Sequence, residues 1–86
     1  MLRETVEKRI TKAINRYIPN ESLNVKNYVS KIILETYKGL RINPELDDNG
    51  KPYSESRDLH FAISITLDDV DTPMILKEAR EQTKDN

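Results

Sequence analysis

The most constraining feature of this sequence is a regular alternation of side chains across residues 59–67. Large apolar side chains occupy every second position, namely Leu59, Phe61, Ile63, Ile65 and Leu67. A period of two matches a β-strand, whose successive side chains point to opposite faces. The alternation therefore predicts a strand over 59–67 with one buried face and one wetter face.

The part of the chain before this alternation has the spacing of helices. Apolar residues recur every three or four positions over residues 2–18 and again in a second segment that ends near Lys38, as in amphipathic helices. Residues 19–22 separate the two segments and begin with Pro19, which stops the first helix because the residue before a proline avoids the α-helical conformation. We expect Asn20 or Ser22 to cap the second helix.

A short strand and a long loop are expected after the second helix. Gly39 suits the C-terminal end of that helix, and residues 40–43 are interpreted as a short strand that Pro44 ends or places at a sheet edge. Residues 45–58 are polar and contain an Asn-Gly pair at 49–50, which is typical of tight turns. This segment is therefore predicted to be a long polar loop.

The chain is predicted to be a single small α+β domain over residues 1–86. Two N-terminal helices would pack on a small antiparallel sheet made of the strands 40–43 and 59–67, followed by a C-terminal helix that Thr72 caps and a frayed tail over 82–86. A two-stranded sheet is only marginally stable, and its exposed edge invites pairing with another strand. We therefore expect a homodimer.

The composition limits the compartment and the chemistry. The chain contains no cysteine, which excludes thiol chemistry and cysteine-based zinc sites and fits a reducing environment. No stretch is apolar enough to span a membrane, and the first residues lack the pattern of a signal peptide. The expectation is a cytoplasmic protein that makes no membrane contact.

Charge is unevenly distributed along the chain. Residues 1–41 hold nine basic and four acidic side chains, a net charge of +5, whereas residues 42–86 hold five basic and eleven acidic side chains, a net charge of −6. This asymmetry predicts a polarised surface. The two halves either pair with each other, within one chain or between protomers, or leave the basic part available to an acidic partner.

The catalytic motifs that this chain partly matches are incomplete. His60 is the only histidine, and Asp58 and Ser64 are near it in the sequence, but a triad needs a serine on a constrained turn and no G-x-S-x-G element is present. With two glycines in the chain, neither a G-x-G-x-x-G loop nor a Walker A loop can form. We interpret His60 as a surface residue and expect no enzymatic activity.

Two acidic segments have some features of metal sites but fit none. Asp68, Asp69 and Asp71 follow the expected strand, where carboxylates hold Mg²⁺ in some enzymes. Acids at such positions also form turns and stabilise helix N-termini. Residues 45–56 partly fit the EF-hand loop, but Ser56 stands where that loop requires a glutamate. We expect no metal ion and no cofactor.

The strongest binding candidate is a basic stripe on the first helix. Four cationic side chains share one side of that helix, namely Lys8, Arg9, Lys12 and Arg16. Cations in such a row suit a phosphate backbone, although the sequence pI of about 5.8 is lower than that of most dedicated nucleic-acid-binding domains. The stripe is also compatible with a merely solvated helix face.

Three apolar or aromatic residues are candidates for contact with a protein partner. Leu34 and Tyr37 lie outside the narrow apolar stripe of the second helix, and Tyr53 stands beside Pro52 in the polar loop. Aromatic residues in such places often anchor interfaces. The leading hypothesis is a non-catalytic interaction or regulatory accessory protein that binds itself or another protein. The alternative is a nucleic-acid-binding regulator that uses the basic stripe.

Overall fold

The protein folds as four α-helices with no sheet among residues 2–83, the part of the chain that the computed structural model describes. The helices are α1 (Arg3–Tyr17), α2 (Leu23–Ile42), α3 (Glu55–Thr66) and α4 (Asp71–Gln82). The expected α+β fold and its antiparallel sheet are therefore wrong. No helix within these residues is both long and apolar enough to cross a membrane.

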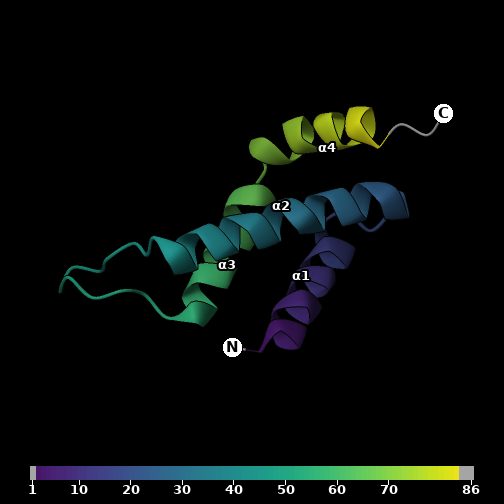
Figure 1. Cartoon of the computed structure of the whole chain (residues 1–86). Helices are drawn as coiled ribbons and strands as arrows, with labels where there is room; N and C mark the ends of the chain where they lie inside the picture. The colour runs from purple at the N-terminus through teal and green to yellow at the C-terminus, as the bar shows by residue number, and fades with distance from the viewer. Residues whose placement is uncertain (1, 84–86) are drawn as a thin grey trace.

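α2 lies at the centre of the molecule (Figure 1), and α1, α3 and α4 all pack against it. α1 and α3 touch each other only lightly. The centre of the core is formed by Val29 and Ile33 of α2 with Leu59 of α3, all of them fully buried. α4 contributes one buried residue, Ala79, so it is the helix least anchored by apolar packing.

The predicted strand over 59–67 is in fact most of α3 together with the residue that ends it. Every second member of a period-two pattern is also four residues away, so Leu59, Ile63 and Leu67 lie along one face of a helix. Leu59 and Leu67 are buried, and Ile63 packs against the core. The same alternation that fits a strand therefore also supplies the apolar face of a helix.

The residues between the large apolar ones distinguish the two structures. Ala62 and Thr66 would lie on the wetter face of a strand, but both are buried in α3. By contrast Ile65, on the expected buried face, is 39% exposed. The buried positions thus follow the three-and-four spacing of a helix, and small side chains at two of them made this spacing hard to see in the sequence.

α3 also has a start signal that lies inside the expected polar loop. The Ser54 hydroxyl accepts a hydrogen bond from the backbone N–H of Arg57 at 3.1 Å, which caps the helix. Glu55 and Asp58 follow in the first turn, where acidic side chains favour the helix N-terminus. The last four residues of the segment 45–58 are consequently helical.

The predicted strand over 40–43 is wrong because α2 continues through Gly39 to Ile42. Asn43 caps the C-terminal end of the helix, and its N–H donates to the Gly39 carbonyl at 2.9 Å. The proline that follows cannot extend the helical hydrogen bonds. At the other end of α2, the Ser22 hydroxyl accepts a hydrogen bond from the N–H of Val25 at 3.2 Å, which confirms Ser22 as the cap.

The connection between α2 and α3 projects from one end of the molecule (Figure 1). A single β-bridge joins Leu46 to Pro52, and the Asp47 N–H donates to the Lys51 carbonyl at 2.8 Å. Gly50 has a φ of 76°, a value that glycine adopts without a steric penalty. The turn predicted from the Asn-Gly pair is therefore confirmed.

α4 begins at Asp71, one residue before the threonine expected to cap it. The Asp68 carboxylate accepts hydrogen bonds from the backbone N–H groups of Val70 and Asp71. The Thr72 hydroxyl instead donates to the carbonyl of Thr66 at 3.4 Å. Of the expected frayed tail 82–86, Gln82 ends the helix, and the last three residues lie outside the described part of the chain.

Candidate functional site

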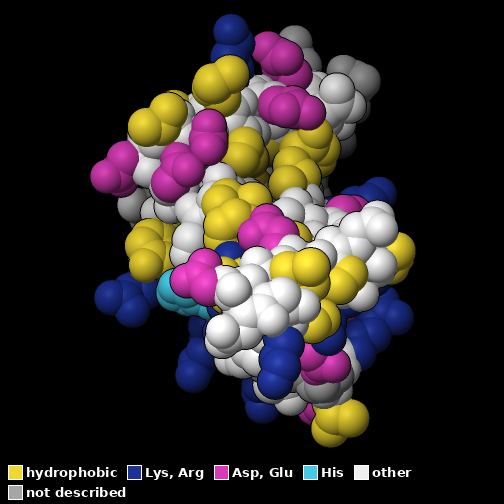
Figure 2. All heavy atoms as spheres, turned by 90° about the vertical axis from the view of Figure 1, so that its left-hand side faces the viewer, with side chains coloured by type: hydrophobic (Ala, Val, Ile, Leu, Met, Phe, Trp, Pro, Cys, Tyr) yellow, Lys and Arg dark blue, Asp and Glu magenta, His cyan; other side chains and the backbone are white. Residues whose placement is uncertain are grey.

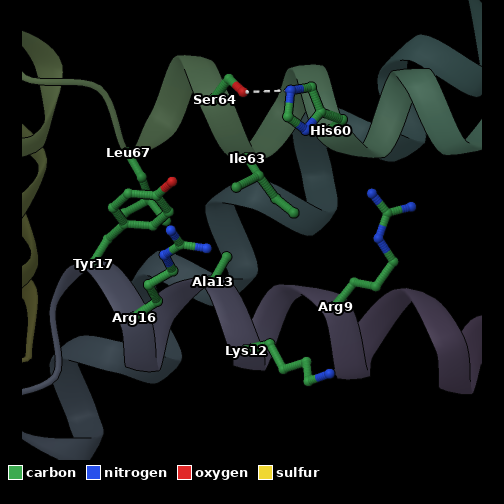
Figure 3. A pocket seen from close by; sticks show the side chains of 9 residues that line it. All are labelled: Arg9, Lys12, Ala13, Arg16, Tyr17, His60, Ile63, Ser64 and Leu67. Carbon is green, nitrogen blue, oxygen red and sulfur yellow. Dashed lines mark hydrogen bonds between the residues drawn. The ribbon is translucent and has the colours of Figure 1, made fainter.

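A groove runs between α1 and α3 because both helices pack on α2 but meet each other only lightly. Its volume is about 600 Å³, within the range of about 300–1,000 Å³ that small-molecule sites occupy. Figure 3 shows side chains from both helices around it. The lining residues are Arg9, Lys12, Ala13, Arg16, Tyr17, His60, Ile63, Ser64 and Leu67.

The α1 wall of the groove is cationic. Arg9, Lys12 and Arg16 are spaced by three and four residues, which places them along one side of a helix. The adjoining side of α1 buries Val6 and Ile10 among other apolar residues. The structure therefore brings three of the four residues of the predicted basic stripe to one groove, while Lys8, the fourth, is not among the lining residues.

The α3 wall and the floor have a different chemistry. His60 and Ser64 are one helical turn apart, with 3.5 Å between the histidine Nε2 and the serine Oγ, and both face the groove (Figure 3). Ala13, Ile63 and Leu67 supply apolar surface between the walls. The groove thus combines a cationic wall, a neutral polar wall and an apolar floor.

The cations of the groove have no acidic partner. Among residues 2–83, no carboxylate lies within ion-pair distance of Arg9, Lys12 or Arg16. The Arg9 guanidinium donates to the Ser56 hydroxyl at 3.1 Å, and the Arg16 guanidinium lies 5.7 Å from the centre of the Tyr17 ring. These neutral contacts leave the positive charge of the wall uncompensated.

The basic and acidic halves of the chain do pair, but elsewhere. The ion pairs between them join Arg41 to Asp58 and Glu55 and join Glu21 to Arg80. Lys and Arg side chains consequently still gather in the lower part of the view in Figure 2, while most Asp and Glu side chains lie in its upper part. The polarised surface expected from the sequence is present.

Asp58 belongs to a charged cluster that no pattern in the sequence indicates. Its carboxylate is buried at the junction of α2 and α3. It accepts hydrogen bonds from Arg41 at 2.7 Å and from Arg57 at 3.3 Å. The Arg57 guanidinium also lies over the rings of Tyr53 and Phe61, 3.8 and 4.6 Å from their centres. We call these five residues the junction cluster.

Asp58 is not available to act with His60 and Ser64 as a catalytic triad, because it belongs to the junction cluster. Because both oxygens of Asp58 bind arginines, this carboxylate does not orient His60, whose ring contacts Ser64 instead. Within residues 2–83, no group of three or more His, Asp or Glu side chains is arranged to hold a metal ion, and the three aspartates after α3 are not such a group. Asp68 instead serves the start of α4.

The residues predicted to contact a protein partner are largely occupied within the chain. Tyr37 is 8% exposed and belongs to the core, and burial raises the pKa of its hydroxyl. Leu34 is half-buried and packs against the core, while the ring of Tyr53 carries Arg57. α2 needs apolar residues on several faces because three helices cover it. Tyr37 therefore offers little side-chain surface to a partner.

The sequence located the cationic wall but not the rest of the groove. His60 and Ser64 were visible in the sequence as neighbours on one element, yet their position opposite Lys12 and Arg16 depends on how α1 and α3 pack on α2. No protein-family model matches the chain, and the comparisons with curated proteins and with solved structures give no match. The chemistry of the groove itself therefore carries the functional argument.

Proposed function

We propose that this protein is a small, non-catalytic regulatory protein that binds nucleic acid through the groove between α1 and α3. The observation that carries the proposal is the uncompensated charge of Lys12 and Arg16, which are exposed and have no ion-pair partner among the described residues. Phosphates that bind such cations displace condensed counterions, which favours association at low salt.

The same structure weakens the reasons for an interaction module. The homodimer was expected from a free strand edge and from surplus apolar surface on the second helix. Residues 59–67 form no strand. Of the two surplus residues of α2, Tyr37 is buried in the core and Leu34 is partly buried against it. A binding function then rests more on charge than on apolar contact.

The low net charge of the chain is compatible with a local nucleic-acid-binding face. Acidic side chains concentrate on the part of the molecule away from α1 (Figure 2), so a phosphate backbone would be repelled there and attracted to α1. A polarised surface of this kind orients a polyanion along one helix. Binding of this kind needs no catalytic group.

The test is binding of fluorescently labelled DNA and RNA oligonucleotides, followed by anisotropy at low and high salt. The double variant Lys12→Glu/Arg16→Glu should abolish binding at low salt. The matched control is Lys31→Glu/Lys38→Glu, which makes the same charge change at exposed positions of α2 outside the groove. The control should retain most of the affinity. Equal losses in both variants, or no binding by the unaltered protein, would contradict the proposal.

Self-association is the second candidate function because apolar side chains are exposed at the start of α4. Val70 is 78% and Met74 70% exposed, and such side chains contribute to interfaces when they lie together. Light scattering of the unaltered protein and of Val70→Lys/Met74→Lys would test this. A dimer that dissociates in the variant supports self-association through α4, and a monomer in both cases excludes it.

A further inference from the structure

We infer that the groove binds single-stranded rather than double-stranded nucleic acid, with one base held against the groove's apolar floor. This inference rests on the proposed function and specifies its ligand. Its basis is the arrangement of three chemically different surfaces around one groove, together with an exposed aromatic ring at its end (Figure 3).

The cross-section of the groove matches a nucleotide better than a bare phosphate. Lys12 and Arg16 on one wall suit the phosphate, whereas Ala13 and Ile63 on the floor suit a flat, largely apolar base. In a duplex the bases are stacked and paired inside, so a duplex presents mainly phosphates and sugars to a helix that lies along its backbone. Only a strand with accessible bases can use the cations and the floor together.

Tyr17 adds a surface for stacking. It is the last residue of α1 and is 57% exposed, so the core does not account for its aromatic ring. The neighbouring Arg16 guanidinium lies 5.7 Å from the ring centre. Proteins that bind single strands combine a cationic track with aromatic side chains of this kind, on which bases stack.

The α3 wall completes the site with groups that can read a base edge. His60 and Ser64 are exposed, face the groove and carry both hydrogen-bond donors and acceptors. They contact each other at 3.5 Å, at the limit of a hydrogen bond, so a base edge can replace that contact at little cost. The phosphates then lie on α1 and the bases turn toward α3.

The experiment compares one labelled oligonucleotide as a single strand and annealed to its complement, in DNA and RNA forms, by anisotropy at low salt. The unaltered protein should bind the single strand at least about tenfold more tightly. Tyr17→Ala should weaken single-strand binding at least about fivefold, the loss expected for one base–aromatic stack. Tyr17→Phe keeps the ring and should stay within about twofold.

The outcomes separate this inference from the proposed function. Equal affinity for both forms, with no effect of Tyr17→Ala, overturns the inference but leaves a phosphate-binding face in place. No binding of either form overturns the proposed function itself. Displacement of the single strand by polyglutamate at matched charge concentration would show a general polyanion site and would also overturn the inference. Circular dichroism of both Tyr17 variants checks that the fold is unchanged.

Discussion

Two regions of this protein hold a pair of cationic side chains on or beside α3, and they differ in whether carboxylates pair with those cations. At the junction cluster, Arg41 and Arg57 both bind the buried Asp58. In the groove, Lys12 and Arg16 have no acidic partner among residues 2–83. The first pair closes a contact between helices, and the second pair faces an open groove.

The difference shows that burial and a carboxylate partner decide whether a cationic side chain stabilises the fold or remains available to bind a ligand. A buried carboxylate loses its hydration and depends on its cations, so removing one partner leaves an uncompensated group. Exposed cations keep their hydration and contribute little to folding. Substitutions in the junction cluster should therefore lower the free energy of unfolding. Substitutions of the groove cations should lower only the affinity for nucleic acid.

The largest expected effect is that of Asp58→Ala. Removing this carboxylate leaves a buried gap beside two arginines, which keep only their pairs with the partly exposed Glu55 and Glu45. Breaking a buried ion pair typically costs about 3–5 kcal/mol. Arg41 and Arg57 are each about one-third exposed and can turn toward water, so we expect a loss of about 3 kcal/mol in the free energy of unfolding. Urea denaturation followed by circular dichroism measures it.

Two further variants control this prediction. Asp58→Asn keeps one acceptor oxygen and should lose less stability than Asp58→Ala. Asp48→Ala removes an exposed carboxylate from the loop and should change the free energy of unfolding by less than about 0.5 kcal/mol. If Asp58→Ala were as mild as Asp48→Ala, the junction cluster would not be structural.

A smaller loss is expected from Arg57→Lys. The guanidinium stacks on Tyr53 and Phe61 while it binds Asp58, and a lysine ammonium cannot reproduce both the fork and the stacking. We expect a loss of about 1 kcal/mol in urea denaturation. The matched control is Arg80→Lys, where a largely exposed arginine makes a single ion pair with Glu21, and it should be nearly neutral. Equal effects at both positions would contradict the role of stacking.

The double variant Lys12→Ala/Arg16→Ala should show the opposite behaviour. Its free energy of unfolding should change by less than about 0.5 kcal/mol because both side chains are exposed and unpaired. In single-strand titrations over a range of salt, the slope of log K against log salt should fall by about 0.7 for each lost phosphate contact. A marked loss of stability would mean that the groove cations support the fold and would erase the contrast with the junction cluster.

Local signals in the sequence predicted the parts of the fold that depend on neighbouring residues. The two N-terminal helices and the turn at Gly50 follow from spacing and backbone preference, and capping chemistry narrowed the cap of α2 to Asn20 or Ser22, of which Ser22 is the cap. The prediction of a strand over 59–67 was wrong because an apolar residue at every second position also puts an apolar residue at every fourth position. The same pattern therefore fits one face of a strand and one face of a helix. Burial of Ala62 decides between these structures, and a sequence gives no direct measure of burial at a small residue.

The sequence predicted only one wall of the groove, the cationic wall on α1. The spacing of Arg9, Lys12 and Arg16 on one helix is a local property, so the cationic wall could be found. Its partner wall, His60 and Ser64, comes from α3, which is far from α1 in the sequence, and only packing on α2 brings the walls together. Likewise, the pairing of Asp58 with Arg41 and Arg57 is a tertiary contact that no spacing rule encodes.

The smallest expected effects concern two acids that meet without a cation. Asp68 and Asp71 lie at the start of α4, and neither has an ion-pair partner within the described residues. The backbone N–H of Asp71 donates to the Asp68 carboxylate and lowers the pKa of Asp68. The hydrogen bond with Asp68, and then its negative charge, raise the pKa of Asp71.

The two shifts predict stability changes of opposite sign with pH. Asp68 stabilises the fold above its ordinary pKa of about 3.9, and this contribution is lost as the pH falls through its lowered value. The contribution of Asp71 is complete below about pH 3.9 and is lost as the pH rises through its raised value. At neutral pH, Asp71→Asn should therefore slightly raise the urea midpoint, and Asp68→Asn should lower it.

Urea midpoints of the two variants at pH 7 and pH 3 test this assignment. The gain from Asp71→Asn should vanish at pH 3, because the protonated Asp71 then donates to Asp68 much as an asparagine amide would. The same loss of stability in both variants at pH 7 would mean that the acids act only through the helix N-terminus. An uncompensated acid pair would then behave unlike the uncompensated cations of the groove, and charge pairing alone would not separate structural from binding residues.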